Sequence, residues 1–248
     1  NSEQRENFRI GEIFCPKPGS NGLMGLDPST RTQFLMKSLP LFLLAATLSS
    51  PAAVLYQEDF THVGGGAEVA TSTVGWVSYY TSTAEAIANP AAAPRMAIGN
   101  QPGSDNLNPG YLFSQGAGTG TTHTYVGFEN TAFSILPTDI STITFTQGNS
   151  ATALATRLMV QQDGNWYATN ATFGTIAMDL PAFRAGSAEL ETFNFVLTAS
   201  AWRAVTITPG IELSLATGTI ASNLSSTAPI TSIGFLTTHP HEAFATHS

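Results

Sequence analysis

The stretch ALATRLMVQQDGNWYATN, residues 153–170, decides the fold expected for this chain. Leu158 and Val160 are two positions apart, so in an extended strand both side chains point to the same face. The dipeptide Asp163-Gly164 favours a two-residue turn between antiparallel strands. The Trp166-Tyr167 pair that follows starts the returning strand. The stretch therefore predicts a β-hairpin with one apolar face.

The same alternation of apolar and polar residues recurs along the rest of the chain. Turn residues such as Gly148-Asn149, Pro209-Gly210 and Gly218 separate these runs. Several short alternating runs with turn signals between them are typical of an antiparallel all-β sandwich or barrel. Residues 82–96, STAEAIANPAAAPRM, are the one place where a helical turn is expected. The alternating runs are STITFTQ (141–147), ETFNFVLTA (191–199), WRAVTIT (202–208), IELSLATG (211–218) and SIGFLTT (232–238).

Residues 36–53 have the features of a secretory signal peptide. Met36-Lys37 provides a basic start, an apolar run follows, and SSPAA supplies the small residues of a cleavage site. The apolar run is shorter than the roughly 20 residues that a membrane-spanning helix needs. A buried helix of a soluble domain is the alternative, but Pro40 interrupts the run and no amphipathic pattern accompanies it. We therefore expect export by the general secretory route.

The first 35 residues differ in character from the rest. They are polar, aperiodic and rich in Gly, Pro and Asn, which indicates either translated upstream sequence before a start at Met36 or a disordered tail. In both cases we expect residues 1–35 to lie outside the fold. Residues 54–248 then form a single domain, which is long enough to bury a core of its own.

Composition limits the chemistry of the exported chain. The only cysteine is Cys15, so residues 54–248 contain no disulfide, no cysteine-ligated zinc and no thiol nucleophile. The whole chain has a net charge of −8, no lysine follows Lys37, and four arginines remain after it. Nucleic acids and anionic membranes are bound by clustered Lys and Arg, so this composition argues against both partners.

Three stretches together resemble a known group of exported proteins. These are VLYQEDF (54–60), RLMVQQDGNWYATN (157–170), and FNFVLTASAWRAVTITPGIELSLATG (193–218) followed by ITSIGFLT (230–237). They are similar to LamG-like or concanavalin-like jelly-roll proteins of verrucomicrobial and planctomycete-type bacteria. The resemblance implies an antiparallel β-sandwich of jelly-roll type. It also implies delivery to the cell envelope or an extracellular matrix.

The end of the chain departs from that group. Many of its members carry a last strand with Asp-Asn-Phe and then a Pro-Glu-Pro sorting signal, whereas this chain closes with HPHEAFATHS, residues 239–248. We therefore expect the last strand and the anchor to be missing, and residues 239–248 to add no closing strand. Such a gap would leave an unpaired sheet edge, which favours association.

Carboxylates and histidines are the first candidates for chemistry. Glu189 and Glu191 have the spacing of a same-face pair, as a glycosidase requires, but they are expected in a loop. Glu58 or Asp59 is the candidate ligand of a structural Ca²⁺, which binds carboxylate and carbonyl oxygens. The His239-Pro240-His241-Glu242 run has too few ligands for a zinc site on its own. No nucleophile or phosphate-binding motif accompanies them.

Aromatic residues are the second set of candidates. Trp166 and Tyr167 are strand neighbours, so one ring should be buried and the other at least partly exposed. With Tyr79 and Tyr80 they form the candidate sugar-stacking residues, while Trp202 is expected in the core. We therefore expect a secreted, non-enzymatic surface or matrix module that binds neutral polysaccharide weakly. A polysaccharide-degrading glycosidase or lyase, or a fragment of one, is the alternative, and a purely structural envelope protein is the second alternative.

Overall fold

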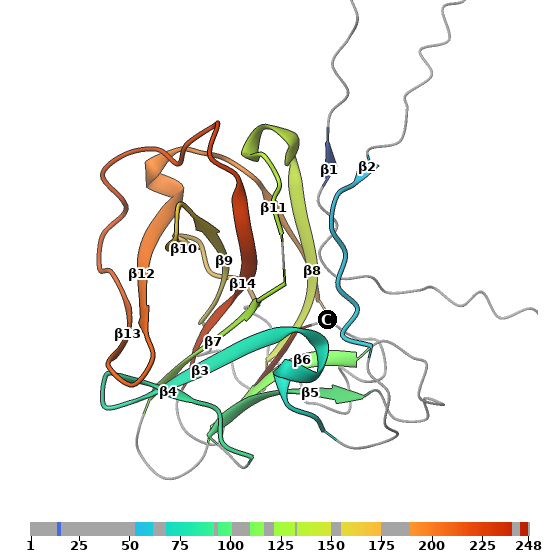
Figure 1. The fold of residues 1–248 in the computed structure, drawn as a ribbon, viewed down its shortest axis with the longest axis vertical. Helices are drawn as coiled ribbons and strands as arrows, with labels where there is room; N and C mark the ends of the chain where they lie inside the picture. The colour runs from blue at the N-terminus through green and yellow to red at the C-terminus, as the bar shows by residue number, and fades with distance from the viewer. Residues whose placement is uncertain are drawn as a thin grey trace, which may run out of the picture.

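The chain forms two layers of antiparallel β-sheet, as the computed structural model shows (Figure 1). It describes residues 14–15, 53–61, 68–91, 94–100, 110–116, 122–131, 133–149, 155–174, 189–239 and 244–247. All the strand ladders in these ranges are antiparallel. The predicted all-β sandwich is therefore confirmed.

One sheet has eight strands and the other has five. The larger sheet runs in the order β13 (Glu212–Leu215), β12 (Trp202–Thr208), β10 (Asn165–Thr169), β9 (Ala155–Gln162), β14 (Ile230–His239), β7 (His123–Glu129), β3 (Trp76–Ser82) and β4 (Glu85–Ala88). The smaller sheet runs in the order β11 (Glu189–Asn194), β8 (Thr142–Asn149), β15 (Phe244–His247), β6 (Gly110–Gln115) and β5 (Arg95–Asn100). Short 3₁₀ turns η1 (Thr71–Val74), η2 (Pro137–Asp139) and η3 (Ala199–Ala201) connect the strands.

The predicted hairpin is formed by β9 and β10. Asp163 and Gly164 have φ angles of 51° and 74°, so both turn residues adopt the left-handed conformation that a two-residue hairpin turn needs. Asn165 pairs with Gln162 directly after the turn, and Trp166 pairs with Gln161. The register of this hairpin places Trp166 beside Gln161 on one face of the sheet.

The main core lies between the two sheets. Leu158 and Val160 of β9 point into it, whereas Met159 points to the other face of the larger sheet, which confirms the predicted alternation. Trp202 is fully buried there, and its indole nitrogen donates to the carbonyl of Val196 at 2.7 Å, so its predicted core position is also confirmed. The other sheet contributes Met96, Ile98, Leu112, Ile143 and Phe145.

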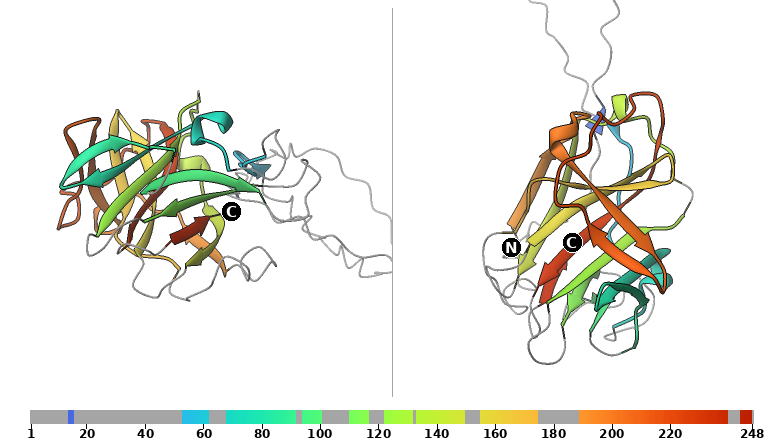
Figure 2. Two further views of the ribbon diagram at one scale, coloured as in Figure 1. Left: turned by 90° about the horizontal axis from the view of Figure 1, so that it is seen from below. Right: turned by 90° about the vertical axis from the view of Figure 1, so that its left-hand side faces the viewer.

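The larger sheet curls strongly, as Figures 1 and 2 show. Its two edge strands β4 and β13 approach each other, and the turn between β12 and β13 contacts β4: Ala86 forms a bridge with Pro209, and the backbone N–H of Gly210 donates to the carbonyl of Ala86 at 2.5 Å. The concave face is filled by a second apolar cluster. We call this the concave cluster; its buried members are Ala86, Val126, Met159, Trp166, Ala168, Val205, Leu213 and Leu236.

The expectations for residues 239–248 and for the helical turn within residues 82–96 are wrong. Residues 239–248 do add a strand, because β15 pairs with both β8 and β6 in the middle of the smaller sheet. Its partners are distant in sequence, so the local pattern of FATH gave no sign of them. Residues 85–88 form strand β4 instead of a helical turn, because Ala86 pairs with Thr81 and packs into the concave cluster.

The chain start is described only in part. Phe14–Cys15 (β1) pairs with Ala53–Val54 (β2), so two residues of the segment expected outside the fold form a short ladder. The remainder of residues 1–35 and the predicted signal peptide up to residue 52 lie outside the described residues. Residues 54–60 continue from this ladder along the sandwich, and we call them the N-terminal strap.

Candidate functional site

A pocket of about 240 Å³ opens at one end of the concave face. Three neighbouring strands build it, because Gln161 of β9 pairs with Trp166 of β10 on one side and with Ser232 of β14 on the other. The end of β7 and the turn after it complete the wall. We call this the Trp166 pocket; it is lined by Phe128, Glu129, Asn130, Thr131, Gln161, Trp166, Thr231 and Ser232.

Two aromatic rings form the apolar wall of the Trp166 pocket. The ring centroids of Phe128 and Trp166 are 4.4 Å apart, and Tyr79 extends the row with its ring 6.4 Å from that of Phe128. Only 8% of Trp166 is exposed, so its ring offers an edge to the pocket and not a whole face. The wall therefore provides a small apolar contact area.

Amide groups form the polar rim of the Trp166 pocket. The hydroxyl of Thr231 donates to Oε1 of Gln161 at 3.1 Å, which holds this amide in place. Within the described residues, the amide nitrogen of Gln161 and the side chain of Asn130 have no hydrogen-bond partner. Asn130 is exposed and Gln161 is half-buried. Both amides are therefore free to bond to a ligand in the pocket.

A buried carboxylate stands behind the rim. Glu129 is 4% exposed, and it accepts hydrogen bonds from the Tyr56 hydroxyl at 2.9 Å and from the Thr131 backbone N–H at 2.8 Å. Ser232 also donates to the carbonyl oxygen of Glu129 at 2.5 Å. The Tyr56 contact links the N-terminal strap to the wall of the Trp166 pocket.

A second carboxylate, that of Glu58 in the N-terminal strap, lies close to Glu129. Glu58 accepts hydrogen bonds from the indole nitrogen of Trp76 at 3.3 Å and from the Phe60 backbone N–H at 2.6 Å. Burial raises the pKa of Glu58, and the negative charges of Glu129 and Asp59 add to the effect, while the two hydrogen bonds oppose it. Burial raises the pKa of the Tyr56 hydroxyl, and the negative charges of Glu58 and Glu129 raise it further. Tyr56 therefore stays protonated and acts as a donor.

The predicted calcium ligands make local contacts instead of converging. Asp59 accepts a hydrogen bond from the Thr61 backbone N–H at 3.0 Å, whereas Glu58 turns toward Trp76. In the described part of the chain, no three His, Cys, Asp or Glu side chains gather as metal ligands. The calcium site stays a prediction, and the contacts visible for Glu58 tie the strap to the sheet.

The four predicted aromatic residues divide between two faces. Trp166 and Tyr79 belong to the concave face, although only Trp166 lines the pocket. Tyr167 and Tyr80 point the other way and pack against the main core, where Tyr80 stacks on Tyr125 at 6.3 Å. Tyr167 is half-buried beside the buried Trp166, as the alternation predicts. One of the four predicted rings therefore lines the Trp166 pocket.

The remaining candidates lie away from the Trp166 pocket or outside the described residues. Glu191 is in strand β11 and not in a loop, and it accepts a hydrogen bond from the Gly174 backbone N–H at 2.8 Å. Glu189 is in the same strand, but its side chain is outside the described residues, as are the side chains of His239, His241 and Glu242. The expected Glu189–Glu191 loop is therefore wrong, because the pair extends the smaller sheet by pairing with β8.

Sequence reasoning did not identify the rim residues Asn130, Gln161 and Thr231. The position of Gln161 could have been predicted, because it directly follows Val160 in the strand. Its side chain therefore points to the face opposite that of Leu158 and Val160. The sequence around Asn130 and Thr231 gave no such indication, because these residues lie at strand ends that are distant in sequence.

No helix in the described ranges is long and apolar enough to cross a membrane. Comparisons with models of known protein families and with curated proteins find no match to this chain.

Proposed function

We propose that this chain is an exported, non-enzymatic surface or matrix module that binds a neutral sugar unit in the Trp166 pocket. The observation that carries the proposal is the combination of an aromatic wall with unpartnered amides on one small pocket. Sugars present apolar C–H faces and hydroxyl groups that both donate and accept. An aromatic edge and the amides of Gln161 and Asn130 match these two features.

The charges around the Trp166 pocket favour a neutral ligand over an anionic one. Glu129 lines the pocket and no arginine does. Among the described arginines, Arg157 and Arg203 are bonded to backbone carbonyls elsewhere, at 2.7 Å to Thr169 and 2.7 Å to Ala216, and Arg95 pairs with Glu68. Sulfated or phosphorylated polymers are recognised by cationic side chains, which this pocket lacks among the described residues.

The size of the Trp166 pocket sets the expected affinity. Its volume of about 240 Å³ is below the range of roughly 300–1,000 Å³ that is typical of drug-sized sites. It therefore suits one sugar ring that is contacted on part of its surface. We expect a dissociation constant of about 1 mM, which corresponds to about −4 kcal/mol.

The alternative of a polysaccharide-degrading enzyme needs two carboxylates facing one cleft. Glu129 lines the pocket, but Glu58 bonds to Trp76 and Phe60 and does not line it. We therefore propose binding without cleavage. Release of reducing ends from a neutral glycan, lost in Glu129→Gln, would contradict this part of the proposal.

The test is affinity electrophoresis of the protein through gels that contain neutral glucans, mannans or xylans. Trp166 is nearly buried, so the informative variant is Gln161→Ala, which removes a rim amide without opening the core. Gln57→Ala is the matched control, because Gln57 is exposed and lies outside the pocket. We expect retention on at least one glycan that is lost in Gln161→Ala and kept in Gln57→Ala. Retention equal in both variants would remove the pocket from the site, and no retention on any glycan would favour a structural envelope protein.

A further inference from the structure

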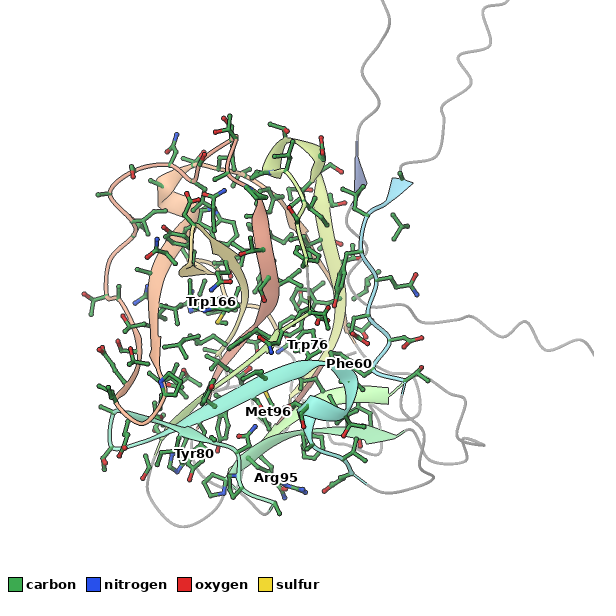
Figure 3. The ribbon with its side chains drawn as sticks, viewed as in Figure 1. Phe60, Trp76, Tyr80, Arg95, Met96 and Trp166 are labelled. Atoms are coloured by element: carbon green, nitrogen blue, oxygen red, sulfur yellow. The ribbon has the colours of Figure 1, made fainter. Side chains whose placement is uncertain are left out.

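A second pocket lies at the edge of the sandwich, between η1, β3 and β5. Its volume is about 510 Å³, and it shares no lining residue with the Trp166 pocket. Figure 3 shows Trp76, Met96 and Arg95 on the strands that border it. We call it the Arg95 pocket; its polar lining residues are Glu68, Thr71, Ser72, Ser78, Asn89 and Arg95.

A buried pair of hydroxyl groups forms part of its wall. The Oγ atoms of Thr71 and Ser78 are 2.7 Å apart, and each residue is only 6% exposed. Asn89 uses its amide nitrogen to donate to Ser78 and to the Met96 carbonyl, and its amide oxygen accepts from the Met96 N–H at 3.1 Å. The amide nitrogen of Asn89 therefore faces Ser78 as a donor, and its oxygen faces the backbone of Met96.

The hydrogen count of this pair leaves one donor over. Two hydroxyl groups carry two hydrogens, and the bond between Thr71 and Ser78 uses one of them. Whichever hydroxyl donates, the other hydrogen has no acceptor among the described residues. A buried polar hydrogen without a partner destabilises the folded chain. Because both residues line the Arg95 pocket, an acceptor inside the pocket would remove this cost.

The rim of the Arg95 pocket combines a donor and an acceptor. Arg95 and Glu68 form an ion pair, so the rim is neutral as a whole. The guanidinium also donates to Oε1 of Gln115 from Nε and Nη2 at 3.3 Å, and to the Ala91 carbonyl from Nη1 at 3.2 Å. One N–H of Nη1 is left over from its five donors. The Glu68 side chain is 42% exposed and can accept further hydrogen bonds.

We propose that the Arg95 pocket is a second saccharide site, which takes a neutral sugar unit through neighbouring hydroxyl groups. Glu68 accepts from one sugar hydroxyl, Arg95 donates to the next, and the Thr71–Ser78 pair donates to a third oxygen. An apolar ligand would leave the buried hydroxyl hydrogen without a partner, and an anion would compete with Glu68 for Arg95. The volume is within the range of roughly 300–1,000 Å³ found for small-molecule sites.

The experiment is an NMR titration of the ¹⁵N-labelled chain with methyl β-D-glucopyranoside, methyl α-D-mannopyranoside and methyl β-D-xylopyranoside. We expect at least one glycoside to shift the backbone amides of Ser72 and Ser78, with a midpoint of about 1 mM. Glu68→Gln should raise this midpoint about tenfold, because it weakens both the acceptor and the ion pair that orients Arg95. Glu85→Gln is the matched control, since Glu85 is exposed on β4 and lines neither pocket.

Two further variants separate this site from the Trp166 pocket. Gln161→Ala should leave the Ser72 and Ser78 shifts unchanged, and the double variant Thr71→Val/Ser78→Ala should weaken them by removing both hydroxyls of the pair. The inference is overturned if none of the three glycosides shifts these amides up to about 50 mM, far above the expected midpoint. It is also overturned if Glu68→Gln binds like the unmodified chain, or if Gln161→Ala abolishes the shifts.

Discussion

The hydrogen bond from Tyr56 to Glu129 should be the main polar attachment of the N-terminal strap. It joins residues 73 positions apart in sequence and ends on a carboxylate that is 4% exposed. Tyr56→Phe removes the hydroxyl and keeps the ring, which packs edge-on against Phe133 with centroids 5.0 Å apart. The substitution therefore tests the hydrogen bond with little change in apolar packing.

The expected loss follows from the partner that remains. Hydrogen bonds to charged groups contribute about 1.5–3 kcal/mol, and the loss is larger when a buried charged acceptor loses its donor. Glu129 keeps the Thr131 N–H on its other oxygen, so one of its two hydrogen bonds survives. We expect Tyr56→Phe to lower the free energy of unfolding by about 2 kcal/mol. In a domain of this size that corresponds to a fall in Tm of about 4–8 °C.

Urea unfolding followed by tryptophan fluorescence measures this loss. Tyr79→Phe is the matched control, because the Tyr79 hydroxyl has no hydrogen-bond partner among the described residues while its ring also packs on a phenylalanine. The control should change stability by less than about 0.5 kcal/mol. A double-mutant cycle with Glu129→Gln should show coupling between the two sites. Equal stability of Tyr56→Phe and Tyr79→Phe would refute the role given to this contact.

Four other predictions concern the acid pair, the termini and the ligand. Burial raises the pKa of Glu58, so the folded state holds this proton more tightly than the unfolded state, and the free energy of unfolding should fall as pH rises from the ordinary carboxyl range through the raised pKa. Glu58→Gln should flatten this fall in urea unfolding measured across pH. An unchanged pH dependence in the variant would argue against the role of Glu58. Removal of residues 240–248 should expose the edges of β6 and β8 and increase aggregation in light scattering, whereas an unchanged monomer would count against β15 as a paired strand. Export from a bacterial host should give a mature N-terminus near Ala53 or Val54 by mass spectrometry, and retention of residues 1–35 would disprove the signal-peptide interpretation. Binding at the Trp166 pocket should improve little from a monosaccharide to a longer oligosaccharide in calorimetric titrations, and a steady gain per added sugar would indicate a groove instead.

The apolar pattern of the strands could be predicted from the sequence because it is a local property. Side chains alternate every second residue, so the faces of Leu158, Met159 and Val160 follow from their order alone. The Asp163-Gly164 turn is local in the same way, since both residues tolerate the left-handed conformation. These features needed no knowledge of which strand pairs with which.

Strand pairing and the composition of the sites could not be predicted in this way. The ladder of β15 with β8 and β6 joins residues that are far apart in sequence, and four residues give too little pattern to find it. The Trp166 pocket likewise combines residues from β7, β9, β10 and β14. The sequence analysis identified one of its lining residues, Trp166. Glu58 was recognised as a notable carboxylate, but its neighbour Glu129 comes from another strand and carried no local signal.

The curl of the larger sheet determines what kind of ligand the concave face can take. Strands β7 and β10 are separated by β14 and β9, so in a flat sheet they would lie three strand spacings, about 14 Å, apart. The rings of Phe128 and Trp166 on these strands are nevertheless 4.4 Å apart. The side chains of this face therefore meet across it, and the contact of Gly210 with Ala86 joins the turn before the edge strand β13 to the other edge strand, β4. The protein's own side chains occupy the space that a polymer would need, and the Trp166 pocket, with Gln161 and Asn130 on its rim, is where the described residues open this face to a ligand. For that reason we favour recognition of single sugar units over binding along an extended polysaccharide.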